Sequence, residues 1–220
     1  RFKSIATSML GKQEQSISIY YDAMLPSDLM LDLTLSVNKK FPHVELNWLQ
    51  STWLEAMNAI ANKQADLAFF SNAKSSFSEK DVASRLLGYI ELGLFCRPTS
   101  GLLQAEILDE HPFRQRVQVI NHNMLNSELK RFMSFSTQQI NLNNFELVCQ
   151  FTTRLGWCVA PLYSAKRYVE AGQLTQVRPL FANSNLKVAM SYYFQPKIEL
   201  APVMKSILAE IEHKSKAYFC

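Results

Sequence analysis

The order of hydrophobic and polar residues between Ser16 and Phe70 predicts alternating strands and helices. Short segments rich in β-branched and aromatic residues alternate with longer segments whose apolar residues recur at helical spacing. In chain order, the predicted strand, helix, strand, helix and strand are Ser16–Tyr21, Pro26–Lys40, Val44–Gln50, Trp53–Lys63 and Asp66–Phe70. Strands joined through helices run parallel with right-handed crossovers, so this segment predicts an open α/β sheet.

An open α/β sheet binds ligands beyond the carboxyl ends of its strands. In this sequence the three predicted strands are followed by the loops Asp22–Leu25, Ser51–Thr52 and Ser71–Ala73. We therefore expect a binding site at these loops.

The second half of the chain repeats this α/β pattern. Two alternating segments, Tyr89–Arg97 and Leu186–Phe194, predict long strands that leave the first lobe and return to it. The elements predicted between them are strands at Val117–Asn121 and Trp157–Ala160 and helices at Asn126–Phe135, Asn143–Leu155 and Pro161–Ala171. A final helix at Leu200–His213 returns to the first lobe, whereas residues Ser100–Arg116 show no clean period.

The predicted fold class is therefore α/β, with two Rossmann-like lobes joined by two crossing strands. Lobe I consists of residues 16–88 and 191–216, and lobe II consists of residues 89–190. Clefts between lobes are preferred ligand sites, so we expect the ligand there.

The helix predicted at Pro26–Lys40 has two apolar faces. Its main stripe recurs every four residues and consists of Leu25, Leu29, Leu33, Val37 and Phe41. Leu31 and Leu35 lie roughly 200° from Leu29, on a different face. A helix packed on one side of a sheet does not need this second face, so another lobe or a second subunit should cover it.

Composition and charge indicate a globular protein without a nucleic-acid surface of its own. Hydrophobic residues make up 48% of the 220 residues and charged residues 19%. The 23 basic and 19 acidic residues give a net charge of +4, and the basic residues form no run of five. No apolar run approaches the roughly 20 residues that span a bilayer, and no signal peptide begins the chain, so we expect a cytoplasmic protein without a membrane partner.

No set of residues forms a known catalytic or metal-binding pattern. The four histidines, which are far apart in sequence, are His43, His111, His122 and His213. The chain has no G-x-S-x-G, H-E-x-x-H or phosphate-binding glycine loop. We therefore expect no enzyme activity, no metal site and no cofactor.

The four cysteines also lack metal-like spacing; they are Cys96, Cys149, Cys158 and Cys220. Buried reduced thiols of a cytosolic protein are the first interpretation. A redox sensor formed by Cys149 and Cys158 is the alternative.

Several packing and capping features together resemble the effector-binding domain of bacterial LysR-type transcriptional regulators. The features, in chain order, are Ile19 to Leu25-Pro26, Phe41-Pro42-x-Val44-x-Leu46, Ala65-Asp66-Leu67-Ala68, Leu155-Gly156-Trp157-x-x-x-Pro161 and Gly172-x-Leu174. The resemblance extends from about Ser16 to Ala209 and rests on the order and spacing of these features. It implies a fold similar to type 2 periplasmic binding proteins, preceded by a winged helix-turn-helix domain and a linker helix.

On this resemblance, residues 1–15 are the end of the linker helix, because Arg1–Leu10 carries apolar residues at helical spacing. DNA would then be contacted only through the missing N-terminal domain. The resemblance also implies an antiparallel homodimer, and a tetramer of the full-length protein, in which helix 26–40 meets a helix of the partner's second lobe. Our candidate is Asn126–Phe135, so the predicted interface residues are Leu31, Leu35, Leu129 and Phe132.

The resemblance also places the effector site. Many relatives have Ser or Thr at two positions that receive an anion, and spacing puts Asp22 and Trp53 there. Asp22 would repel an anion and Trp53 offers a flat apolar face, so we expect a neutral, aromatic or amine-bearing effector, or a partly closed pocket that binds none. The predicted effector-binding residues are Asp22, Ala23, Met24, Ser51, Thr52, Trp53, Ser71, Asn123, Thr153 and Arg154.

Two alternatives stay open at this point. Asp22 could serve as a helix cap without a ligand role, and Arg154 could neutralise it. The chain as a whole could be a solute-binding protein of a transporter with the same fold, although it lacks a signal sequence and has the second apolar face on helix 26–40.

Overall fold

The computed structural model describes residues 16–71, 82–103, 110–125, 130, 134–178 and 186–220. These residues form two compact units. Among the described residues, unit 1 holds 16–71, 82–88 and 190–220, and unit 2 holds 89–103, 110–125, 130, 134–178 and 186–189. Residues 1–15, for which a linker helix was predicted, lie outside the described part.

Unit 1 contains a sheet in the order β2-β1-β3-β9. The four strands are β1 (Ser16–Tyr21), β2 (Glu45–Gln50), β3 (Leu67–Ser71) and β9 (Lys187–Phe194), the last of which begins in unit 2. β1 runs parallel to β2 and to β3, whereas β9 runs antiparallel to β3. The predicted parallel sheet is therefore present, with one returning strand beside it.

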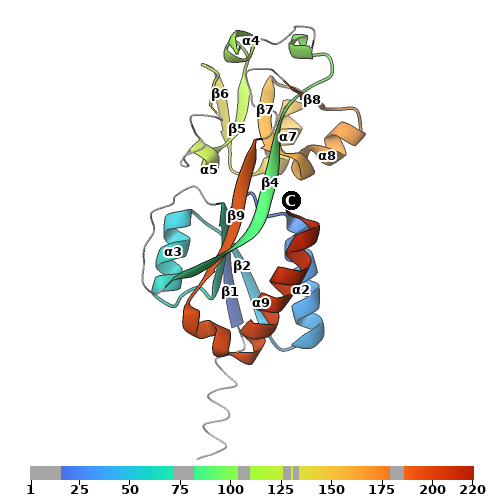
Figure 1. Ribbon diagram of the computed structural model, residues 1–220. Coiled ribbons are helices and arrows are strands. Elements are labelled where there is room, and N and C mark those ends of the chain that lie inside the picture. The colour runs from blue at the N-terminus through green and yellow to red at the C-terminus, as the bar shows by residue number, and fades with distance from the viewer. Residues whose placement is uncertain (1–15, 72–81, 104–109, 126–129, 131–133, 179–185) are drawn as a thin grey trace, which may run out of the picture. The chain divides into compact units, whose positions relative to one another are not determined.

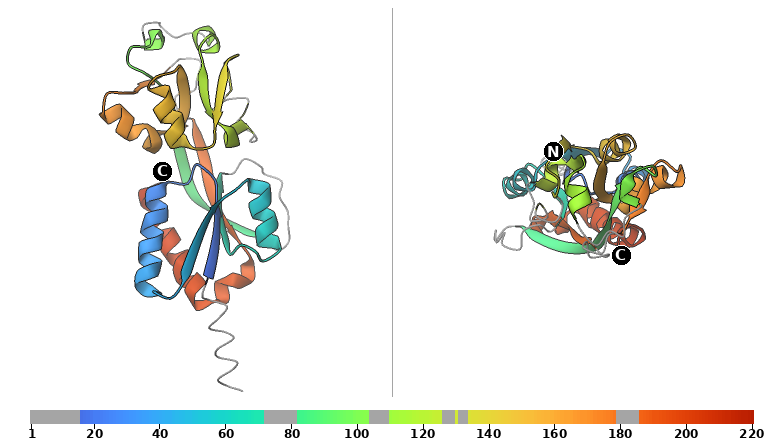
Figure 2. Two further views of the ribbon diagram at one scale, coloured as in Figure 1. Left: turned by 180° about the vertical axis from the view of Figure 1, so that it is seen from behind. Right: turned by 90° about the horizontal axis from the view of Figure 1, so that it is seen from above.

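Helices cover both faces of the unit 1 sheet (Figures 1 and 2). They are α2 (Ser27–Lys40), α3 (Trp53–Ala61) and α9 (Pro202–Lys214), with short 3₁₀ turns at Pro196–Leu200 and Ser215–Ala217. α2 and α9 pack side by side on one face and α3 lies on the other. α2 buries Leu29, Leu33 and Val37 from its predicted main stripe.

Unit 2 has strands in the order β4-β7-β5-β6, with β8 paired to β4. Its strands are β4 (Ala83–Cys96, beginning in unit 1), β5 (Gln118–Asn121), β6 (Gln139–Leu142), β7 (Trp157–Pro161) and β8 (Thr175–Val177). Its helices are α4 (His111–Arg114), α5 (His122–Leu125), α7 (Phe145–Thr152) and α8 (Leu162–Glu170), with a 3₁₀ turn at Gly101–Leu103. β5 runs parallel to β6 and β7, and β4 runs antiparallel to β7.

The start of β7 is fixed by Gly156 and Trp157. Gly156 has a φ of +48°, and a Cβ atom there would lie 1.7 Å from the carbonyl oxygen of Val117, so only glycine fits. Trp157 is fully buried, and its indole N–H donates to the carbonyl of Phe113 at 2.9 Å. The Leu-Gly-Trp segment seen in the sequence is therefore a close-packing feature of unit 2.

Some predicted elements of unit 2 need correction. The prediction omitted β6 and β8, began the first crossing strand at Tyr89 instead of Ala83, and gave α7 five residues too many (13 predicted in Asn143–Leu155, 8 observed). Ser134 and Phe135 are not helical, and most of the helix predicted at Asn126–Phe135 lies outside the described residues. β6 and β8 were missed because strands of three or four residues have too little pattern and form through pairing with neighbours.

Candidate functional site

The carboxyl ends of three parallel strands meet at one edge of unit 1. The register pairs Tyr21 of β1 with Gln50 of β2 and with Phe69 of β3. The residues that follow these strands therefore lie together, as expected for the ligand-binding edge of an α/β sheet. The predicted first-lobe residues at this edge are Asp22, Ala23, Met24, Ser51, Thr52, Trp53 and Ser71.

The side chain of Asp22 is held by two backbone donors. Its Oδ1 accepts from the N–H of Met24 at 2.8 Å and its Oδ2 accepts from the N–H of Ser71 at 2.8 Å. The first bond closes a turn in the loop after β1, and the second ties this loop to the end of β3. Asp22 is not the cap of α2, because Pro26 stands at the N-cap position of that helix.

Burial raises the pKa of the Asp22 carboxyl group. Its side chain is 8% exposed, and burial raises the pKa of its carboxyl group although the Ser71 and Met24 N–H groups act to lower it. Among the ion pairs of the described residues, none includes Asp22. Among the described residues, Asp22 is therefore a buried acid outside any ion pair.

The second corner of the edge is the amino end of α3. Thr52 caps this helix in a capping box: its hydroxyl oxygen accepts from the N–H of Glu55, and the Glu55 carboxylate accepts from the N–H of Thr52 at 2.9 Å. Hydrogen bonds from Thr52 lower the pKa of Glu55. Ser51 is held by its own backbone, since its N–H donates to the carbonyl of Tyr21 at 3.1 Å.

Tyr193 is a residue of this corner that sequence reasoning missed. It lies on β9 opposite Ala68 and, with the half-buried Trp53, packs on the α3 face of the sheet. Burial is the main cause that raises the pKa of Tyr193; its interaction with Trp53 lowers it, and the charge of Asp22 raises it. The sequence contains a signal for it, since Tyr193 lies on the opposite face of the predicted strand from Tyr192, next to the longer apolar face that defined this strand.

The predicted second-lobe residues lie at two opposite edges of unit 2. Asn123 follows the carboxyl end of β5, where its N–H donates to Oδ1 of the buried Asn121 at 3.0 Å. Thr153 and Arg154 instead precede β7, whose first residue, Trp157, pairs with the first residue of β5. β5 and β7 are parallel, so the loop before β7 lies at the amino ends of these strands, whereas Asn123 lies at the carboxyl end of β5. The expectation that Asn123, Thr153 and Arg154 line one site is therefore wrong.

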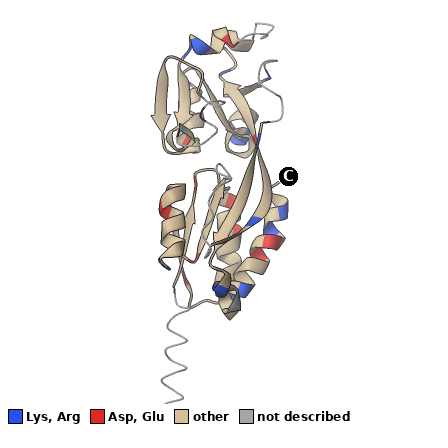
Figure 3. Ribbon diagram, turned by 60° about the vertical axis from the view of Figure 1, so that its left-hand side comes forward, with Lys and Arg blue, Asp and Glu red and all other residues tan. Residues whose placement is uncertain are grey.

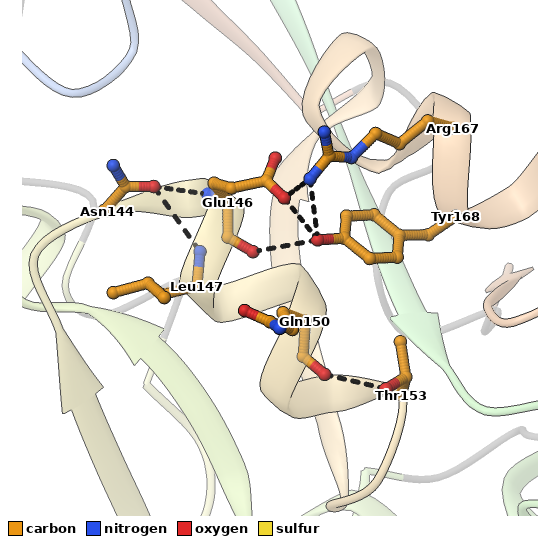
Figure 4. A network of polar contacts seen from close by, with 7 residues as sticks. All are labelled: Asn144, Glu146, Leu147, Gln150, Thr153, Arg167 and Tyr168. Carbon is orange, nitrogen blue, oxygen red and sulfur yellow. Dashed lines mark hydrogen bonds and ion pairs between the residues drawn. The ribbon is translucent and has the colours of Figure 1, made fainter.

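The local contacts of Thr153 are structural. Figure 4 shows its hydroxyl donating to the carbonyl of Gln150 at 2.7 Å, which closes the last turn of α7. At the other end of α7, Asn144 caps the helix, and Glu146 contacts Arg167 and Tyr168 of α8. The contacts of Glu146 fix α7 against α8. The hydroxyl of Thr153 is bound to the backbone of α7.

The second apolar face of α2 is exposed within the chain. Leu31 and Leu35 are each 57% exposed. The other two predicted interface residues, Leu129 and Phe132, lie outside the described residues.

The four cysteines are free, and only Cys220 is exposed. The pKa of Cys158 is raised well above its usual range, first by a hydrogen bond with the thiol of Cys149 and then by burial. Because the thiolate is the reactive form, this environment favours inert reduced thiols over the redox alternative.

The described residues hold no group of three or more His, Cys, Asp or Glu side chains arranged to bind a metal ion. In the same part of the chain, no helix is long and apolar enough to cross a membrane.

Comparison with known proteins defines the class of protein. The family model described as the LysR substrate binding domain matches residues 11–214. The regulatory domain of MetR, a LysR family regulator from N. meningitidis, is 13% identical, with a TM-score of 0.74 over 92% of this chain and 94% of that one. None of the curated proteins compared matches this chain.

Two further solved structures share the fold. The C-terminal domains of a LysR family protein from Agrobacterium tumefaciens are 11% identical, with a TM-score of 0.74 over 93% of this chain and 98% of that one. The reduced regulatory domain of OxyR2 from Vibrio vulnificus is 13% identical, with a TM-score of 0.66 over 91% and 94% of the two chains.

The fold is thus that of LysR regulatory domains, which have the type 2 periplasmic-binding-protein-like architecture, as the sequence predicted. The chain belongs to the LysR substrate-binding domain family. It is the effector-binding regulatory domain of a LysR-family transcription regulator, and this family consists of transcription factors, not enzymes.

Proposed function

We propose that this domain senses a small molecule at the carboxyl edge of unit 1 and passes the binding event to a winged helix-turn-helix domain elsewhere in the full-length regulator. The observation that carries the proposal is the convergence of Asp22, Trp53 and Ser71 at the ends of three parallel strands. A site shared with the second lobe stays a prediction from the sequence. On this proposal the regulator acts in the cytoplasm, where its DNA is.

Binding would act by shifting a conformational equilibrium. A ligand that binds one arrangement of the protein more tightly than another increases the population of the first. The DNA-binding domain would respond to that change through the linker helix predicted for residues 1–15.

We propose that the effector is neutral, aromatic or amine-bearing. The buried carboxyl group of Asp22 disfavours a second negative charge, while the half-buried Trp53, which packs with the buried Tyr193, provides aromatic surface at the same edge. An amine would gain from both features, because ammonium groups interact favourably with carboxylates and with aromatic faces.

We also propose a homodimer formed through the exposed face of α2. Unit 2 carries a second exposed apolar stripe, on α7 and the turn after it. Its members are spaced four residues apart and are Leu147, Phe151 and Leu155, exposed to 38%, 39% and 40%. In a two-fold dimer, α2 of each copy would pack on the α7 stripe of its partner. The same contact would then occur twice, as two-fold symmetry requires. Residues 126–135, for which the sequence predicted a helix, stay the other candidate.

The regulatory role is tested by DNA binding. Figure 3 shows acidic and basic residues interspersed along the described elements, without the basic helix or ribbon that reads a groove. Residues 1–220 alone should therefore bind duplex DNA no better than a weak non-specific cation in a gel shift. The longer protein encoded by the same gene should bind its target sequence, and its gel shift should change when effector is added.

Tight, sequence-dependent shifts with residues 1–220 alone would contradict the proposal. The measurement should be repeated at two salt concentrations, because non-specific binding to phosphates weakens steeply with salt.

A further inference from the structure

Two backbone N–H groups converge on one position at the unit 1 edge. The Met24 N–H group comes from the loop after β1 and the Ser71 N–H group from the last residue of β3, and each nitrogen lies 2.8 Å from a carboxyl oxygen of Asp22. Converging backbone donors at the ends of parallel strands are a typical receptor for an anion. In this protein the acceptor is supplied by the chain itself.

The second donor cluster of the edge is filled in the same way. The first N–H groups of α3 point out of the helix, and such groups attract anions. Here the hydroxyl of Thr52 and the carboxylate of Glu55 form a capping box with this end of the helix. Both donor clusters therefore already have acidic side chains beside them.

No basic residue offsets these acids in the part of the chain that the structure describes. None of its ion pairs includes Asp22 or Glu55. The groups that act on the pKa of Asp22 are burial and the donors Ser71 and Met24. Among the described residues, an anionic ligand at this position would therefore have to displace Asp22 or lie beside a like charge that no ion pair offsets.

We propose that Asp22 is a built-in anion: its carboxyl group occupies the position that an anionic ligand would take, and thereby restricts effectors at this edge to neutral or cationic molecules. This inference deepens the proposed function, because it names the residue that sets the charge of the effector. It also predicts that removing the Asp22 side chain converts the edge into an anion site.

The test is chemical rescue of Asp22→Ala. This variant leaves two donors without their acceptor, so its melting temperature should fall by roughly 5 °C. Sodium formate should restore at least about half of that loss with saturating concentration dependence, compared with sodium chloride at equal ionic strength. The wild type should show no saturable response to formate.

Two matched variants control for other causes. In Asp22→Asn an amide of the same size fills the space, so the stability should fall but formate should not rescue it. Asp66→Ala removes another partly buried acid, which accepts from the N–H of Ser18 at 2.8 Å at the opposite end of β3. Formate should not rescue this variant either, because Ser18 supplies the single N–H donor to the Asp66 carboxyl group within the described part of the chain.

Each outcome decides the question. Saturable rescue of Asp22→Ala alone supports the inference, whereas no rescue, or equal stabilisation of all variants and the wild type, overturns it. If Asp22→Ala does not fold, the yield of refolding in formate against chloride gives the same decision. These results do not depend on DNA binding or on a known effector, so they can fail while the proposed regulatory role stands.

Discussion

Asp22 is the only buried Asp, Glu, Lys or Arg among the described residues. Burial disfavours its charged form and the two backbone donors favour it, and burial is the larger effect on the pKa. The sequence placed Asp22 at the edge, because a polar residue directly after a predicted strand is visible in the pattern. Its partner Ser71 lies 49 residues away, and Tyr193, whose pKa the charge of Asp22 raises, comes from a strand late in the chain, so only the folded structure brings them to this edge.

The raised pKa of Asp22 predicts the sign of a pH effect. Its ordinary pKa is 3.8, and its pKa in the folded protein is higher. Between these two values the folded state binds more protons than the unfolded state, so the stability contributed by this group falls as the pH rises through that interval. Asp22→Asn removes this titration, so the free energy of unfolding of the wild type should decline relative to the variant as the pH rises above 3.8. Urea unfolding of both proteins over a pH series measures the difference. A relative gain of the wild type over this interval would contradict the placement of Asp22 in a site where burial dominates.

Helix α2 has the buried face and the exposed apolar face that its sequence pattern predicted. The pattern predicted two apolar faces, and the structure confirms that Leu29, Leu33 and Val37 are buried while Leu31 and Leu35 are exposed. The pattern does not identify what covers the exposed face, because periodicity marks an apolar face but not the surface that packs on it. Strand β6 was missed for a different reason. Its sequence, Gln-Ile-Asn-Leu, is short and half polar, and it forms a strand by pairing with β5. Helix assignment was therefore reliable where the apolar stripe was long, and strand assignment failed where pairing, rather than pattern, decides.

If the proposed dimer forms through α2, the double substitution Leu31→Asp with Leu35→Asp should shift the protein from dimer to monomer. Burying one leucine contributes roughly 1.5–3 kcal/mol, and an unpaired charge in its place adds a further penalty, so two such changes should weaken the dimer by several hundred-fold or more. Sedimentation velocity of the folded variant measures the change. Leu54→Asp is the matched control, since Leu54 on α3 is 61% exposed but belongs to neither proposed stripe, and it should leave the dimer intact. An unchanged dimer in the folded double variant would remove α2 from the interface.

At the scale of the whole molecule, the sequence predicted the fold class because two long alternating strands and repeated strand–helix units leave few α/β arrangements. The features with family-like spacing, such as Gly156-Trp157, are packing requirements, which is why they identify the fold but not the ligand. The choice of Thr153 and Arg154 failed because sequence order does not show which end of a strand a loop adjoins; the register of β5 and β7 does. The identity of the effector depends on side chains that come together from loops of several elements, and no single stretch of sequence describes that surface.

The most direct measurement of the central claim is a thermal-shift screen of small metabolites, grouped by charge, on the wild type and on Asp22→Ser. Neutral, aromatic or amine-bearing compounds should include those that stabilise the wild type in a saturable way, because binding to the folded state alone raises the melting temperature. Simple dicarboxylates should have little effect on the wild type and should stabilise Asp22→Ser, in which the two backbone donors are released and a hydroxyl replaces the acid. If dicarboxylates strongly stabilise the wild type and the substitution does not improve their effect, Asp22 does not set the charge of the effector and this description of the site is wrong.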